Sequence, residues 1–207
     1  MMSDELLTFV VSWYTRHCDE DWEHSYGVRF VNTRDDGWVV ECDLIGTELE
    51  GREIGWVSIM PHRPAAGRWR ANGLRFEAIA QTGDLWAAFF AFRAFVLNSD
   101  LIPGFESEPL LSLLDSRALA TQHLVRGGQP VVRVDTLDNP GWTVMARTDG
   151  TQGAGRSKPI ERIERSETEW LHWWSSTDTF EAACGPGDLP WALRQLNDYV
   201  SPTSEGI

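Results

Sequence analysis

The chain has 207 residues and a formal net charge of −13, and acidic residues are in excess in both halves. Its hydrophobic content of 42%, with eleven Trp and nine Phe, excludes a disordered chain because such residues bury enough apolar area to offset the entropy of ordering. The charge excludes a basic nucleic-acid-binding protein and instead favours solubility and the capture of a basic partner.

The cysteines and the N-terminal segment bear on the compartment. Cys18, Cys42 and Cys184 are odd in number and have no metal-type spacing, which argues against a disulfide framework and favours a reducing cytoplasm. The apolar run from Leu6 to Val11 is too short for a signal-peptide core or a membrane span. We therefore expect a cytoplasmic protein without a membrane partner.

In the first half, apolar residues at helical spacing predict a helix over about residues 4–17, with Ser3 as a candidate N-cap. Alternating runs on either side of an Asp-Gly turn predict an antiparallel hairpin of strands at 26–31 and 38–44. Three further strands are expected at 56–60, 68–70 and 74–79. Asp84 is then expected to cap a second helix that extends from Leu85 to Val96.

The second half has the same order of elements. A helix is expected near 108–124 and a last helix from about Asp188 to Val200. The five strands between them are expected near 130–136, 142–147, 159–165, 168–175 and 178–184.

Equivalent residues of the two halves are separated by 104 positions. The offset relates Gly37-Trp38 to Gly141-Trp142, Phe76-Glu77-Ala78 to Phe180-Glu181-Ala182, and Gly83-Asp84-Leu85 to Gly187-Asp188-Leu189. A fixed internal offset indicates one structural unit used twice. We predict an α+β fold of two similar modules, 1–100 and 101–207, each an antiparallel β-meander packed against an N-terminal and a C-terminal helix. The short seam at 98–107 predicts that the modules touch, either pseudo-symmetrically or through one shared sheet.

The most unusual segment extends from His17 to Gly27 and has no copy in the second half. Its Cys-Asp-x-Asp-Trp-Glu-His-Ser-Tyr-Gly pattern, with Asp43-Leu44-x-Gly46-Thr47-x-Leu49-Glu50-Gly51, resembles the immunity protein 53 family of bacterial polymorphic toxin systems. The second half resembles the same family through three other segments: Thr136 to Trp142 (Thr-Leu-Asp-Asn-Pro-Gly-Trp), Ile163 to Trp170 (Ile-Glu-Arg-Ser-Glu-x-Glu-Trp) and Phe180 to Leu189.

The resemblance implies a small α+β protein that is made beside a toxin, binds the toxin domain and blocks it. Each half departs from the family pattern. The first has Arg34-Asp35-Asp36-Gly37 where the family turn reads Asp-Asn-Pro-Gly, and it has no Glu-Arg-Ser-Glu segment; the second has Arg126-Gly127-Gly128 in place of the Asp-Trp-Glu-His-Ser-Tyr segment. Each half has kept part of a pattern that one domain normally holds whole, which leaves open which half binds the toxin or whether both must.

Four carboxylates flank Trp22, and a partly exposed aromatic ring among carboxylates suits binding to a basic surface. The alternative is that Trp22 and Tyr26 pack inward while the acidic side chains face water. The candidate partner-binding residues are Asp19, Glu20, Asp21, Trp22, Glu23, His24 and Tyr26 in the first half and Asp138, Asn139, Glu164, Glu167 and Glu169 in the second.

An enzymatic alternative uses His17, Cys18 and His24 as a Cys–His catalytic pair or as metal ligands, as in a small hydrolase or a metal-dependent enzyme. No second cluster in the sequence completes a ligand set, a triad or an oxyanion hole. A structural or signalling adaptor without a toxin is a third alternative. We therefore expect a non-enzymatic immunity protein, without a metal, a cofactor or a nucleic-acid partner, that neutralises a toxin domain by covering its basic working surface.

Overall fold

The computed structural model describes residues 4–99, 108–124 and 129–201. Its first module consists of α1 (Glu5–His17), the 3-10 turn η1 (Trp22–His24), β1 (Val28–Thr33), β2 (Gly37–Asp43), β3 (Glu53–Ser58), η2 (Pro64–Ala66), β4 (Gly67–Asn72), β5 (Arg75–Ala80) and α2 (Leu85–Leu97). The second consists of α3 (Pro109–Thr121), η3 (Gln122–Leu124), β6 (Pro130–Thr136), β7 (Trp142–Arg147), β8 (Lys158–Glu164), β9 (Trp170–Ser175), β10 (Thr179–Cys184) and α4 (Leu189–Val200).

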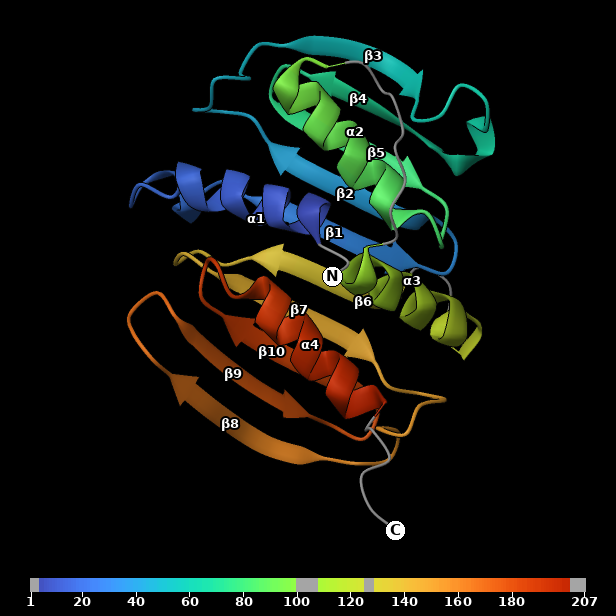
Figure 1. Cartoon of the computed structure of the whole chain (residues 1–207), viewed down its shortest axis with the longest axis vertical. Coiled ribbons are helices and arrows are strands. Elements are labelled where there is room, and N and C mark those ends of the chain that lie inside the picture. The colour runs from blue at the N-terminus through green and yellow to red at the C-terminus, as the bar shows by residue number, and fades with distance from the viewer. Residues whose placement is uncertain (1–3, 100–107, 125–128, 202–207) are drawn as a thin grey trace.

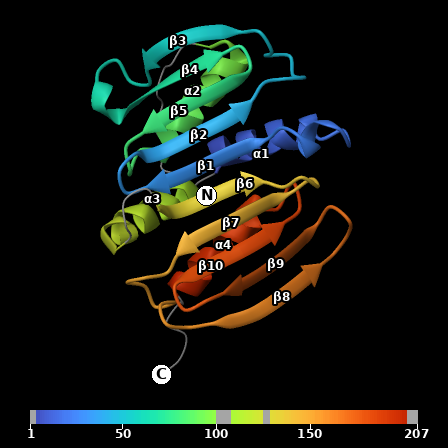
Figure 2. The ribbon, with the colours of Figure 1, turned by 180° about the vertical axis from the view of Figure 1, so that it is seen from behind.

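All strands belong to one ten-stranded antiparallel sheet in the order β3-β4-β5-β2-β1-β6-β7-β10-β9-β8. The α-helices cover one face of this sheet, and Figures 1 and 2 show that, in the part of the chain that the structure describes, the other face carries no helix. The α+β fold of two modules is therefore confirmed, and the modules share one sheet. Within each module the fifth strand pairs with the second, β5 with β2 and β10 with β7. Only the third, fourth and fifth strands of each module therefore form a meander.

The pairing of β1 with β6 places a pseudo-two-fold axis at the centre of the sheet. Phe30 pairs with Val134, and these two residues are themselves separated by the repeat offset of 104. The neighbouring pairs Arg29–Asp135 and Val31–Arg133 exchange under the same offset. The irregularity between Ile54 and Val57 in β3 recurs between Lys158 and Glu161 in β8. Because β1 and β6 are antiparallel, equivalent loops of the two modules lie at opposite ends of the sheet.

The N-termini of α1 and α3 cap each other across this axis. The backbone N–H groups of Leu6 and Leu7 donate to the carboxylate of Glu108 at 2.6 and 3.3 Å, and the N–H of Leu110 donates to Asp4 Oδ1 at 2.8 Å. Asp4 and Glu108 are equivalent residues of the repeat. The exchange satisfies N–H groups that have no partner within their own helix. The predicted N-cap, Ser3, and most of the predicted seam (100–107) lie outside the described residues, and the boundary between residues 100 and 101 stays a prediction.

A second contact between the modules corrects the predicted cap of α2. The carboxylate of Asp84 makes no hydrogen bond to its own helix and instead accepts from Arg63 at 3.0 and 2.9 Å. The N–H groups of Gly83 and Leu85 donate to Asp115 of α3, at 2.9 Å and at 3.2 Å to the nearer oxygen. Asp115 also accepts from the Nε1 of the fully buried Trp38 at 2.6 Å. A carboxylate of the second module thus completes the core of the first.

The strand boundaries differ from the prediction by a few residues. β1 begins at Val28 rather than residue 26 because the N–H groups of Ser25 and Tyr26 donate to the carbonyl of Trp22 and close the η1 turn. β3 begins at Glu53 rather than 56 because the irregularity after Ile54 lets Glu53 pair with Asn72.

Candidate functional site

The segment after α1 is a compact turn held by two of its own carboxylates. Asp19 Oδ1 accepts from the N–H groups of Asp21 and Trp22 at 3.2 and 3.0 Å, and these hydrogen bonds hold the pKa of Asp19 below its usual value. The carboxylate of Glu23 accepts from the N–H groups of Asp19 and Glu20, both at 3.0 Å. The turn presents Asp19, Glu20 and Asp21 to solvent.

Of the two alternatives for Trp22, the structure shows the inward-packed one, and a partly exposed ring is wrong. The indole is only 6% exposed, it packs against Trp13 with the ring centroids 5.9 Å apart, and its Nε1 donates to the carbonyl of Ile45 at 2.7 Å. Glu23 is also buried, with its carboxylate hydrogen-bonded to the backbone of the turn, and Tyr26 is half-buried against Trp22. The Trp22 ring therefore supports the turn from the core side, and the residues of this segment that can contact a partner are the exposed carboxylates together with His24 and Ser25.

The second-module candidates also lie in turns at strand ends. Asp138 and Asn139 are exposed in the turn between β6 and β7, and Glu167 and Glu169 are exposed in the turn between β8 and β9. Glu164 is the last residue of β8 and accepts a hydrogen bond from His172 Nε2 at 2.9 Å.

The candidate segments of the two modules lie at the same end of the sheet. His24 Nδ1 lies 3.1 Å from Asp138 Oδ1, and this carboxylate raises the pKa of His24. A Cβ placed on Gly141, beside this turn, would lie 3.4 Å from the Trp170 ring, where the next turn ends. In Figure 1 this end of the sheet is the left edge, where α1 ends and α4 begins. We call it the acidic rim and define it by residues 18–26, 44–50, 137–141 and 165–169.

Two groups of charged residues in this region were not among the sequence candidates. Glu48 accepts from His17 Nε2 at 2.9 Å, and Glu50 accepts from the N–H of Gly46 at 2.8 Å. Both lie in the Asp43–Gly51 segment, whose resemblance to the family could have identified them. On the bare face beside the rim, a hollow of about 200 Å3 is lined by paired charges from both modules, which include Arg29, Glu41, Asp43, Arg75 and Asp135. The alternation of these charged residues with apolar ones along the strands is the pattern by which the sequence could have identified them.

The residues of the catalytic alternative do not form a catalytic group. The thiol of Cys18 donates to the carbonyl of Tyr14 at 3.4 Å, and burial raises its pKa to about 11, whereas a nucleophilic cysteine needs a lowered pKa. His17 bonds to the carbonyl of Trp13 and to Glu48, and His24 bonds to Asp138. Among the residues that the structure describes, no group of three or more His, Cys, Asp or Glu side chains is arranged to hold a metal ion.

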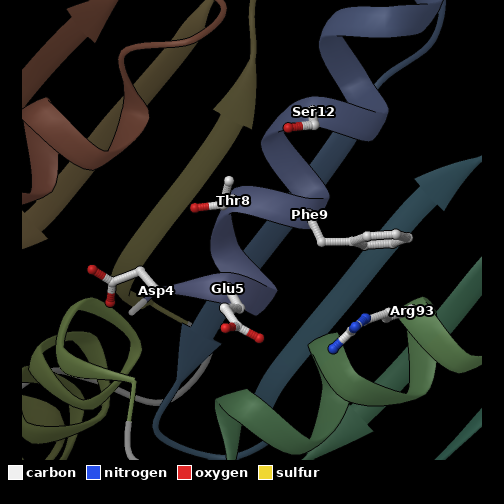
Figure 3. Close-up of a pocket in the computed structure, with 6 residues that line it drawn as sticks. All are labelled: Asp4, Glu5, Thr8, Phe9, Ser12 and Arg93. Carbon is white, nitrogen blue, oxygen red and sulfur yellow. The ribbon is translucent and has the colours of Figure 1, made fainter. Parts of the chain in front are cut away.

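A groove of about 440 Å3 lies away from these residues, on the helical face between α1 and α2. Figure 3 shows Phe9 and Ser12 of α1 and Arg93 of α2 along it, with the Arg93 guanidinium 5.9 Å from the centre of the Phe9 ring. Asp4 lines the same groove but already accepts a hydrogen bond from Leu110. The groove contains none of His17, Cys18 and His24.

The described helices include none that is long and apolar enough to cross a membrane. All three cysteines are free, and Cys42 and Cys184 are buried in the core.

Comparison with known proteins assigns both modules to one family. The model of immunity protein 53 matches residues 7–96 and 128–201, which is most of the chain in two copies. No curated protein and no solved structure matches the chain. Each matched range covers one half of the pseudo-symmetric sheet, from its central strand, β1 or β6, to its edge strand, β3 or β8. The chain belongs to the immunity protein 53 family.

Proposed function

We propose that this protein binds a cognate toxin domain in the cytoplasm and neutralises it by covering its basic working surface, without catalysis of its own. Membership of an immunity protein family supports a protein partner that is a toxin. The observation that carries the assignment of the site is the meeting of the exposed acidic turns of both modules at one end of the sheet, where His24 and Asp138 are 3.1 Å apart.

The acidic rim suits a basic protein surface for two reasons. Its exposed carboxylates lie on turns that hydrogen bonds and buried rings hold in place; they are Asp19, Glu20, Asp21, Glu48, Glu50, Asp138, Glu167 and Glu169. Groups that are already ordered lose less conformational entropy on binding. Fixed negative charge also accelerates encounter with a positive surface and opposes binding to nucleic acids and anionic membranes.

Growth rescue tests the proposal. The toxin domain encoded in the neighbouring reading frame is expressed alone, with this chain, and with a variant in which Asp21, Asp138 and Glu169 are replaced by Lys. We expect the wild-type chain to restore growth and to co-purify with the toxin domain, and the variant to do neither at an unchanged melting temperature. Rescue without co-purification would contradict neutralisation by binding, and rescue by the variant would contradict the assigned surface.

A catalytic mode of protection is tested by the same assay. Cys18→Ser is expected to leave rescue intact, because the Cys18 thiol donates to the carbonyl of Tyr14 and its pKa is raised rather than lowered. Loss of rescue in Cys18→Ser with binding retained would favour the enzymatic alternative.

A further inference from the structure

The repeat gives the protein two equivalent sets of loops, and the sheet places them at opposite ends. The β1–β6 pairing relates the acidic rim, residue by residue, to the loops that contain 33–37, 61–65, 122–124 and 148–154. We call this set the opposite end. A protein that had kept both sets alike would present two identical binding surfaces.

The two ends differ in charge. The rim contains nine carboxylates, Asp19, Glu20, Asp21, Glu23, Glu48, Glu50, Asp138, Glu167 and Glu169, and one Arg, Arg165. In the described part of the opposite end there are three, Asp35, Asp36 and Asp149, and two Arg, Arg34 and Arg63. The replacements are direct, since Arg34 occupies the position of Asp138, and Arg63 that of Glu167.

The segments that resemble the family follow the same division. The first module resembles it through residues 18–27 and 43–51, and the second through 136–142, 163–170 and 180–189. Apart from the first residues of β10, these segments lie at or directly beside the rim, because β1 begins where β6 ends and β10 ends where β7 begins (Figure 1). Among the described residues, the departure of the first module from the family pattern at Arg34–Gly37 belongs to the opposite end.

We infer that the protein binds one toxin domain per chain, across the junction of the modules, and that both modules contribute to this single surface. The inference rests on the proposed function and goes beyond it in the number and composition of the binding sites. It also answers which module binds the toxin, because each module supplies a different part of one surface. The opposite end supplies none.

Matched charge reversals in the full-length chain test the inference, with the neighbouring toxin domain as the probe. Asp21→Lys reverses a rim charge of the first module, Glu169→Lys one of the second, and Asp35→Lys an exposed charge of the opposite end. We expect each rim reversal to raise the Kd about tenfold or more, and the control to change it less than about threefold. Isothermal titration measures the Kd and the number of sites, and light scattering on the purified complex gives its mass.

The expected result is a 1:1 complex that is weakened by reversal in either module. Two toxin domains per chain, sensitivity to only one module, or equal sensitivity to Asp35→Lys would overturn the inference while leaving the proposed function intact. Absence of any complex with the wild-type chain would overturn both. Melting temperatures within about 2 °C of the wild type are required of every variant, and Asp21→Asn and Glu169→Gln replace any reversal that fails this requirement.

Discussion

Asp115 gives the sharpest prediction about stability, because one carboxylate of the second module holds the core of the first. It is 6% exposed and accepts from Trp38 Nε1 and from the N–H groups of Gly83 and Leu85. Asp115→Ala leaves three donors without this acceptor, at a cost of about 1–3 kcal/mol for each buried group. Burial of the carboxylate offsets part of that, since it raises the pKa of Asp115 to about 6.

The unpaired donors and the cost of the buried charge together set the change in the free energy of unfolding. A pKa raised from 3.8 to about 6 corresponds to a cost of about 3 kcal/mol for the ionised form at pH 7. With about 2 kcal/mol for each of the two buried donors, Trp38 Nε1 and the N–H of Leu85, and about 1 kcal/mol for the N–H of the exposed Gly83, Asp115→Ala should lower the free energy of unfolding by about 2 kcal/mol. Asp115→Asn keeps one acceptor oxygen and removes the charge, and it should cost only about 1 kcal/mol. Since domains are stable by about 5–15 kcal/mol, the alanine variant still folds.

The dependence on pH has a definite sign. Because the folded pKa lies above the unfolded value, this group contributes stability at low pH that is lost as the pH rises through about 6. Relative to Asp115→Asn, the wild type should therefore gain about 1 kcal/mol between pH 7 and pH 5. Urea denaturation followed by Trp fluorescence measures both effects, and Ser116→Ala, exposed on the same helix, is the control. Two results would refute the reasoning. One is a free energy of unfolding of Asp115→Ala within about 0.5 kcal/mol of the wild type; the other is a wild type that loses stability relative to Asp115→Asn between pH 7 and pH 5.

Three further predictions concern single contacts. Glu108→Ala should destabilise the protein by about 1–2 kcal/mol through loss of the cap on Leu6 and Leu7, and an unchanged denaturation midpoint would contradict the cap. Gly37→Ala should cost more than Gly51→Ala, because both have φ near +75° but only the Gly37 Cβ would meet a neighbour, the Ala80 oxygen at 2.5 Å; equal losses in urea would contradict the steric part. The thiol of Cys18, whose pKa is raised to about 11, should react with iodoacetamide at pH 8 roughly a hundredfold more slowly than an ordinary cysteine. Mass spectrometry measures the rate of labelling, and labelling of Cys18 at the ordinary rate would contradict the raised pKa.

The fixed offset explains why so much of the fold could be predicted from one sequence. Each element is seen twice, so a weak pattern in one half is supported by its copy, and α1 and α3 occupy equivalent ranges, Glu5–His17 and Pro109–Thr121. The pairing of β5 with β2 could not be predicted, because the local pattern does not specify which strand follows a long loop in the sheet.

The candidate site was predicted less completely, for physical reasons that particular residues show. Trp22 is surrounded by acidic residues in sequence, yet its indole reaches Ile45, whose position depends on the β2–β3 loop. Asp115 occupies the position of Val11 in the repeat, and its burial depends on the other module. Both contacts are long-range in sequence. The joining of His24 to Asp138 likewise follows only from the antiparallel β1–β6 pair.

Hydrogen exchange of the complex with the toxin domain tests the central claim most directly. Slowed exchange on binding should appear together in residues 18–26, 137–141 and 165–169 and be absent from the equivalent turns at 33–37 and 61–65. Protection that is confined to one module, or that appears equally at both ends of the sheet, would contradict a single acidic rim built from both modules.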